Sequence, residues 1–221
     1  FMETIAALTD PRDRKQFYYH ATLFRQIIVW IVRLIFRFLA RIEVHGLEHL
    51  PADGPVVLAC NHLTNFDVFP MQLVLPRPIF FMGKEELFRN PVMDWAFRQL
   101  GAFPVYRGER DQWAILHAER VLAHRQVLGI FPEGGRSKGG SLRKGKSGAA
   151  RLASQTGCPI VPMSIQGTNR IGKSFHRPRV IIQLCPPVYP GHAEPQTALT
   201  ERMKTTIAGS LPPEMRGVYS A

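Results

Sequence analysis

The chain has 221 residues, 45% of them hydrophobic and 20% charged, which is enough for one sizeable core without requiring a second domain. Its 28 lysines and arginines outnumber 17 acidic residues, and the formal charge of +11 favours an anionic partner such as a phosphorylated metabolite, nucleic acid or acidic membrane. The three cysteines form no Cys-x-x-Cys pair, which argues against a disulfide framework and a zinc site, so we expect no metal.

The first long apolar segment spans residues 23–42. Arginines interrupt it at intervals of four or eight residues: Arg25, Arg33, Arg37 and Arg41. On a helix this spacing places the arginines along one drifting stripe. A spanning helix needs roughly 20 mostly apolar residues, and the longest charge-free run here covers residues 26–32. We therefore predict an amphipathic helix in the membrane interface, with Arg25, Arg33 and Arg37 near lipid phosphates and Trp30 in the acyl boundary. The alternative is a helix packed on the protein's own core with its arginines in water.

Beyond residue 46, short apolar runs alternate with longer periodic ones. The short runs predict strands at residues 56–60, 79–82, 102–105, 127–131, 160–165 and 180–184. The longer runs predict helices at residues 68–75, 91–100, 111–124 and 146–156, followed by a tail with a loop and a short helix. The pattern favours a single α/β domain over residues 46–221, with a mostly parallel sheet flanked by helices, preceded by a membrane-association segment over residues 1–45.

A histidine and an aspartate follow the first predicted strand. His62 and Asp67 are five positions apart, roughly 140° around a helix, so they cannot share a helix face. A turn through Thr64 and Asn65 can instead fold Asp67 back onto the imidazole, where it holds one tautomer and stabilises the imidazolium. His62 is then a candidate general base for a hydroxyl. The alternative is a loop histidine, with Asp67 capping the next helix.

A glycine-rich turn follows the strand predicted at 127–131. Residues 131–137 read FPEGGRS, so a strand end, a glycine pair and Arg136 stand together, a construction that lets backbone N–H groups approach an anion. No acidic residue occurs from Gly134 to Ala193. The other reading is an ordinary strand-to-loop turn. Since sites in parallel sheets lie beyond the carboxyl ends of strands, both motifs together indicate an enzyme that abstracts a proton beside a phosphate.

Residues 140–147 read GSLRKGKS and match the phosphate-loop pattern of nucleotide-hydrolysing proteins. No predicted strand leads directly into the first glycine, and no acidic residue follows closely to support magnesium. We therefore predict a basic turn that leads into a helix, with an NTPase as an unfavoured alternative. A non-catalytic module that docks on anionic lipid is a further alternative. Aromatic residues are not interleaved with the basic cluster, so we expect no nucleic acid partner.

Several segments together resemble the sequence blocks of the glycerolipid acyltransferases. They are residues 61–67 (NHLTNFD), 84–87 (KEEL), 101–107 (GAFPVYR), 131–137 (FPEGGRS) and 159–162 (PIVP), in the family's order and approximate spacing. The resemblance covers about residues 46–190, and the chain looks like the bacterial 1-acyl-sn-glycerol-3-phosphate acyltransferases. Two positions depart from the usual pattern, since Gly135 stands where threonine is common and Thr64 where serine is common.

The resemblance implies acyl transfer from a thioester, acyl carrier protein or coenzyme A, to the sn-2 hydroxyl of lysophosphatidic acid, giving phosphatidic acid. Glycerol-3-phosphate, lyso-ornithine lipid and other lysophospholipids are alternative acceptors. His62 would remove the hydroxyl proton and Asp67 would orient His62, without any cofactor besides the thioester co-substrate.

The remaining site residues also come from the resemblance. Arg107 and Arg136 would hold the acceptor phosphate, with Lys84 a weaker candidate, because the planar guanidinium pairs two phosphate oxygens. The motif residues that would shape the turns are Asn61, Glu133 and Gly134. The expected location is the cytoplasmic face of the cell membrane, as a peripheral or monotopic protein that binds an anionic surface.

Overall fold

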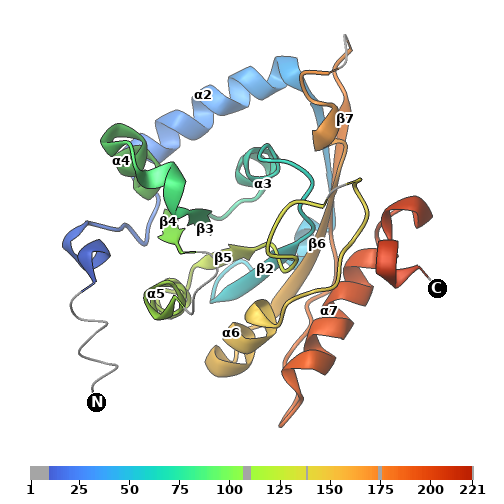
Figure 1. Cartoon of the computed structure of the whole chain (residues 1–221). Coiled ribbons are helices and arrows are strands. Elements are labelled where there is room, and N and C mark those ends of the chain that lie inside the picture. Colours follow the sequence, from blue (N-terminus) through green and yellow to red (C-terminus); the bar gives the residue numbers. More distant parts are fainter. Residues whose placement is uncertain (1–9, 107–110, 138, 174–175, 221) are drawn as a thin grey trace.

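A seven-stranded sheet runs through the centre of the computed structural model, which describes residues 10–106, 111–137, 139–173 and 176–220 (Figure 1). The strands are β1 (Arg41–His45), β2 (Val56–Cys60), β3 (Ile79–Lys84), β4 (Ala102–Val105), β5 (Val127–Ile130), β6 (Ile160–Gln166) and β7 (Arg179–Leu184). They lie in the order β1-β7-β6-β2-β5-β3-β4. Among these seven strands, β6 and β7 are the one antiparallel pair. The predicted α/β fold with a mostly parallel sheet is confirmed.

Helices cover both faces of this sheet (Figure 1). They are α2 (Leu23–Leu39), α3 (Val68–Val74), α4 (Pro91–Gln99), α5 (Gln112–Ala123), α6 (Gly148–Thr156) and α7 (Gln196–Gly209). One face packs against α2 and α3, with α4 beside them, and the other face packs against α5, α6 and α7. The sheet is therefore the middle layer of three.

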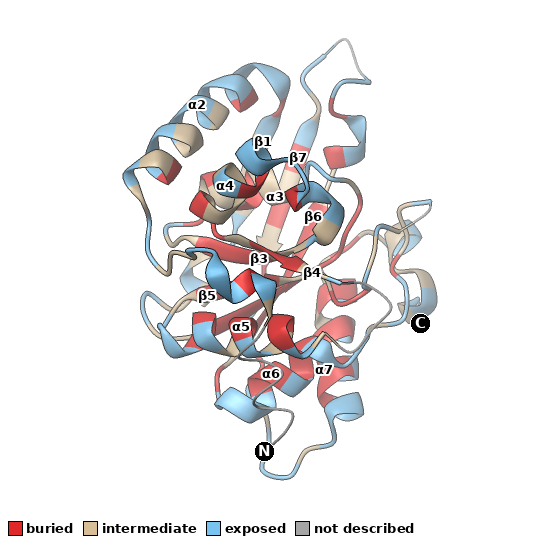
Figure 2. Ribbon diagram, turned by 60° about the vertical axis from the view of Figure 1, so that its left-hand side comes forward, coloured by how far each residue is buried: buried red, intermediate tan, exposed pale blue. Residues whose placement is uncertain are grey.

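The central strand β2 shows why the sheet is buried on both sides. All five of its residues are buried, and they alternate between two hydrophobic clusters. Val57 and Ala59 pack towards α5, α6 and α7, whereas Val56 and Leu58 pack towards α2 and α3. Figure 2 shows the resulting band of buried residues through the middle of the molecule. A continuous apolar run of this kind is typical of a parallel strand covered by helices.

The strand order brings four carboxyl ends to one edge. β2 pairs in parallel with both β5 and β6, and β5 pairs in parallel with β3. The segments that leave this edge are therefore neighbours: the loop with His62 after β2, the turn with Arg136 after β5, Lys84 at the end of β3 and the loop with Thr168 after β6. This is where a site in a parallel sheet is expected.

Two predicted elements differ from the structure. The helix predicted to residue 42 ends at Leu39, and β1 then pairs in parallel with β7, so a boundary after residue 45 would separate a strand from its sheet. The short helix predicted in the tail is instead the 14-residue α7. Its buried residues Leu199, Met203 and Ile207 recur every four positions, a stripe diluted in the sequence by threonines and charged residues.

Candidate active site

His62 and Asp67 lie against each other at the carboxyl edge of the sheet. His62 Nδ1 is 2.8 Å from Asp67 Oδ2, and both residues are buried. The predicted fold-back of the aspartate onto the imidazole is confirmed. The alternative in which Asp67 caps the next helix is wrong, because α3 begins after Asp67 without a side-chain capping bond.

Four further groups donate to the Asp67 carboxylate. The backbone N–H groups of Leu63 and Thr64 donate to Oδ2 at 2.7 and 2.9 Å. The hydroxyls of Thr64 and Thr168 donate to Oδ1 at 3.3 and 2.5 Å. Because the carboxylate is surrounded by donors, the imidazole Nδ1 carries the proton that faces it. His62 Nε2 is therefore the nitrogen left to accept a proton.

Asn61 anchors the start of the His62 loop to β6, and Phe131 packs on the imidazole. The Asn61 side chain donates to the Ile165 carbonyl oxygen at 3.0 Å and accepts a hydrogen bond from the Ile165 N–H at 2.8 Å. These two bonds continue the pairing of β2 with β6 beyond Cys60, with the Asn61 side chain in place of the backbone. The chain can then leave the strand at His62. The Phe131 ring stacks on the imidazole with centroids 4.0 Å apart and planes at 16°. Asn61 therefore has the turn-forming position expected of it.

The turn over residues 131–137 is connected to His62 through the backbone. The Ser137 N–H donates to the His62 carbonyl oxygen at 2.8 Å. Gly134 has a φ of +67°, a conformation that glycine adopts without the strain of a side chain. Glu133 is buried and makes an ion pair with Lys204 of α7. A Cβ atom at Gly135 would meet no atom within 4 Å, so this departure from the family pattern leaves open space beside the turn.

A cavity of about 860 Å³ opens beside His62. Its polar lining includes His62, Lys84, Arg136 and Ser137, all from the carboxyl edge of the sheet. Its apolar lining comes mainly from α2, α3, β3 and α4, and includes Ile28, Val32, Phe69, Leu73, Phe81 and Phe97, together with Phe131 after β5. Neither Lys84 nor Arg136 has an ion-pair partner within the described residues. The cavity thus combines a candidate base, two cations and an apolar wall.

Of the predicted phosphate ligands, Arg107 lies outside the described residues, and Lys84 and Arg136 both line the cavity. The phosphate-loop string is not preceded by a strand: β5 ends at Ile130, ten residues before Gly140. Leu142 is instead held by the carboxyl-terminal segment, its N–H donating to the Met215 carbonyl oxygen at 2.9 Å. The string forms a loop before α6, as predicted.

Arg25 does not face a membrane, and its prediction as a lipid contact is wrong. The residue is 3% exposed, and its guanidinium donates to the carbonyl oxygens of Leu100 and Ile79 and to the Gln72 side chain. Burial lowers the pKa of Arg25 to about 10. The stripe of arginines drifts by about 120° between Arg25 and Arg37, which is enough to turn the first inwards while the last stays exposed.

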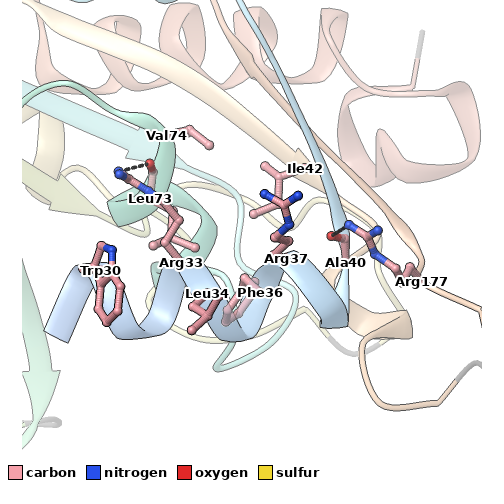
Figure 3. Close-up of a pocket in the computed structure, with 10 residues that line it drawn as sticks. All are labelled: Trp30, Arg33, Leu34, Phe36, Arg37, Ala40, Ile42, Leu73, Val74 and Arg177. Carbon is pink, nitrogen blue, oxygen red and sulfur yellow. Dashed lines mark hydrogen bonds between the residues drawn. The ribbon is translucent and has the colours of Figure 1, made fainter.

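The other side of α2 is open to solvent. Its exposed large apolar side chains are Leu23, Ile27, Trp30, Ile31, Leu34, Ile35, Phe38 and Leu39. Figure 2 shows the helix on the outside of the molecule. Beside it, a groove of about 430 Å³ is lined by Arg33, Arg37 and Arg177 together with apolar residues (Figure 3). No helix within the described ranges is both long and apolar enough to cross a membrane.

Two contributors to the site were missed by sequence reasoning. Thr168 donates to Asp67 from a loop that is 101 residues away in the chain. Phe131 stacks on His62, although its sequence position marks only the end of a strand. No local pattern signals either contact, because both depend on which strands are neighbours in the sheet.

Comparison with known proteins places this geometry in a family. The acyltransferase family profile matches residues 41–166. The chain is 31% identical over 150 residues to the 1-acyl-sn-glycerol-3-phosphate acyltransferase of Bacillus subtilis, covering 67% of this chain and 74% of that relative. It is 34% identical over 167 residues to a chloroplastic 1-acyl-sn-glycerol-3-phosphate acyltransferase of Arabidopsis thaliana, covering 74% of this chain.

The relatives differ in length, and the chain spans less than half of the plant ones. The chain spans 45% of the Arabidopsis thaliana relative and 38% of a chloroplastic relative from Brassica napus. A crystal structure of the 1-acyl-sn-glycerophosphate acyltransferase from Thermotoga maritima superposes with a TM-score of 0.67 at 24% identity, covering 84% of this chain and 79% of that one, which shows a shared fold. From the extent of the profile match and the Bacillus subtilis relative, the chain belongs to the acyltransferase family that includes the 1-acyl-sn-glycerol-3-phosphate acyltransferases.

Proposed function

We propose that the protein transfers a fatty acyl group from an acyl thioester to the sn-2 hydroxyl of 1-acyl-sn-glycerol-3-phosphate, giving phosphatidic acid. The observation that carries the proposal is the lining of one cavity by His62, by the cations Arg136 and Lys84, and by apolar side chains. A lysophosphatidic acid presents a hydroxyl, a phosphate and an acyl chain, which need a base, a cation and an apolar wall respectively. The relatives from Arabidopsis thaliana and Bacillus subtilis are 1-acyl-sn-glycerol-3-phosphate acyltransferases, which agrees with this substrate.

In this proposal His62 is the general base. His62 Nε2 accepts the proton of the acceptor hydroxyl as its oxygen attacks the thioester carbonyl carbon. Asp67, held by four further donors, keeps Nδ1 protonated and stabilises the imidazolium. The tetrahedral intermediate collapses with breakage of the carbon–sulfur bond, and the proton passes from His62 to the departing thiolate. The step yields an ester and a thiol and needs neither a covalent acyl-enzyme nor a cofactor.

Arg136 and Lys84 hold the acceptor phosphate in the same proposal. Both line the cavity and both lack an ion-pair partner among the described residues. Arg136 is exposed and follows Gly135, around whose Cβ position no atom lies within 4 Å, so its guanidinium has the space to pair two phosphate oxygens. Arg107 remains a candidate from the family pattern. The thioester donor is acyl carrier protein or coenzyme A.

We also propose that α2 rests on the cytoplasmic face of the membrane, in the interface. Its exposed apolar side chains form one continuous surface with an exposed fraction of 63% at Trp30 and 69% at Phe38. Arg33, Arg37 and Arg177 lie next to that surface and line the same groove, where lipid phosphates would meet them (Figure 3). Such a placement lets an acceptor lipid enter the cavity, because Ile28, Val29 and Val32 of α2 form part of its wall.

Point substitutions test the membrane proposal better than truncation, since removing residues 1–42 would also cut into β1. Ile31→Asp with Phe38→Asp places two charges on the exposed side of α2. We expect binding to anionic phospholipid vesicles to fall at least tenfold, because a charge is costly to place in the acyl boundary. Glu201→Gln in α7, whose side chain is exposed, serves as a control for a surface change elsewhere. Unchanged vesicle binding would defeat the membrane proposal.

The acyl transfer proposal is tested by purified protein offered three acceptors with two donors. The acceptors are lysophosphatidic acid, glycerol-3-phosphate and lyso-ornithine lipid, and the donors are acyl-ACP and acyl-CoA. We expect transfer to lysophosphatidic acid with the highest kcat/KM. Preference for another acceptor would revise the substrate, whereas vesicle binding without any transfer would favour the non-catalytic module.

A further inference from the structure

Glu133 and Lys204 form an ion pair whose two side chains are completely buried. Lys204 Nζ donates to Glu133 Oε1 at 3.1 Å, and the Arg143 backbone N–H donates to Oε2 at 3.4 Å. The ammonium also lies 5.5 Å from the centre of the Tyr219 ring. The pair joins the turn after β5 to α7, 71 residues further along the chain. Burial lowers the pKa of Lys204, an effect that Glu133 opposes.

Stability alone does not account for this pair. Desolvating two charges costs several kcal/mol per ion before their attraction offsets it, and apolar side chains of similar volume are often as stabilising. Helix α7 is already attached to the sheet by its buried apolar residues Leu199, Met203 and Ile207. The ion pair instead fixes the position of the Glu133 carboxylate in the turn after β5.

That turn is connected to both halves of the site. Phe131, two residues before Glu133, stacks on His62. Ser137, four residues after it, donates its N–H to the His62 carbonyl oxygen at 2.8 Å. Arg136 stands between them and lines the cavity. A shift of Glu133 would therefore move the phosphate-binding cation and a contact of the base together.

We propose that Lys204 is a positioning residue that acts through Glu133 to set the place of Arg136 and His62 in the cavity. The inference rests on the acyl transfer proposed above. Lys204 is not part of the cavity wall, so it has no contact through which it could bind substrate directly. We therefore expect Lys204 to affect binding and reaction of the acceptor lipid. The acceptor phosphate contacts Arg136 and the acceptor hydroxyl contacts His62, the two residues positioned by the turn.

Steady-state kinetics of Lys204→Met test the proposal. The side chains are similar in length, and the change removes the charge. We expect the KM for lysophosphatidic acid to rise and kcat to fall, with kcat/KM reduced at least tenfold and the KM for the thioester donor unchanged. Arg202→Met is the matched control, because Arg202 lies on the same helix and pairs with Glu194 at the surface. It should stay within twofold of wild type.

A pH profile separates positioning from simple loss of structure. In Lys204→Met the buried Glu133 carboxylate loses its ion-pair partner, so kcat/KM for the acceptor should fall more steeply than in wild type as the pH is raised. The other titratable groups around the pair are Cys60 in β2, Glu201 in α7, Tyr219 near the carboxyl terminus, and Arg143 and Lys146 on the adjoining loop. All of them remain in the variant. Adding Glu133→Gln removes the new acid and should abolish the additional pH dependence.

The outcomes distinguish the two proposals. Wild-type kinetics in Lys204→Met would overturn the positioning role, as would an equal rise in both KM values. A wild-type protein without acyl transfer would overturn the proposed function instead. In that case amide hydrogen exchange still tests the inference: residues 131–137 should exchange faster in Lys204→Met and not in Arg202→Met, and equal exchange would refute it.

Discussion

Replacing Asp67 by asparagine separates two tasks of this carboxylate. The side-chain amide keeps its shape, and its oxygen should stay at the Oδ2 position, because the Leu63 and Thr64 N–H groups there can only donate. The amide NH₂ then faces the hydroxyls of Thr64 and Thr168, which can accept. His62 Nδ1 therefore still donates to an oxygen, and the tautomer is retained. What is lost is the charge that stabilises the imidazolium.

The size of this loss follows from the geometry. Opposite charges about 4 Å apart interact by about 4 kcal/mol at an effective dielectric of about 20, and a retained neutral hydrogen bond contributes about 1 kcal/mol. The difference of about 3 kcal/mol corresponds to a decrease in kcat of about 100-fold. The KM values should change little, and the thermal midpoint should fall by only a few degrees.

A continuous assay of thiol release from acyl-CoA, with lysophosphatidic acid as acceptor, measures the effect. Asp67→Ala is the comparison: it leaves two N–H donors in a buried loop without an acceptor, so it should lose stability as well as activity. If Asp67→Asn kept kcat within threefold of wild type, the assignment of imidazolium stabilisation to Asp67 would be refuted.

Three further predictions follow from the site and the core. Arg136→Gln should raise the KM for lysophosphatidic acid about 10- to 100-fold through loss of a charged hydrogen bond, whereas Arg151→Gln on the exposed surface of α6 should not, as acceptor titrations would show. Leu58→Ala in the fully buried β2 should lower the free energy of unfolding by about 3 kcal/mol and Tm by roughly 10 °C in calorimetry; a change below 1 kcal/mol would contradict the packing. Burial lowers the pKa of His117 from 6.5 to about 4, so below pH 6.5 the unfolded state binds a proton that the folded state does not, and stability should fall by about 3 kcal/mol down to pH 4. Denaturant titrations of His117→Phe should show a smaller decline than wild type, and parallel curves would disprove this.

The sequence predicted those features that depend on neighbouring residues. Strand β2 was predicted with its observed bounds because five apolar residues in a row mark a strand covered on both faces. The approach of Asp67 to His62 followed from the short distance between them along the chain. The location of both motifs at one edge followed from the rule that parallel strands end together.

Features that depend on distant partners could not be predicted in the same way. Arg25 has the same sequence spacing as the other arginines of α2, and its burial depends on distant partners: the carbonyl oxygens of Ile79 and Leu100 and the side chain of Gln72. The helix expected over residues 23–42 takes in the start of β1, because the pairing of β1 with β7 joins residues almost 140 positions apart and has no local signal. The Lys204 partner of Glu133 lies in a helix whose apolar stripe is hidden among polar residues.

The central claim is that His62 is the base for acyl transfer to a lysophospholipid hydroxyl. The most direct measurement is the rate at which purified wild-type and His62→Ala proteins convert lysophosphatidic acid and acyl-CoA or acyl-ACP to phosphatidic acid. The claim predicts conversion by the wild type and a decrease in kcat of at least about 1000-fold in the variant, the order expected for loss of a general base. A folded His62→Ala protein with the wild-type rate would contradict it.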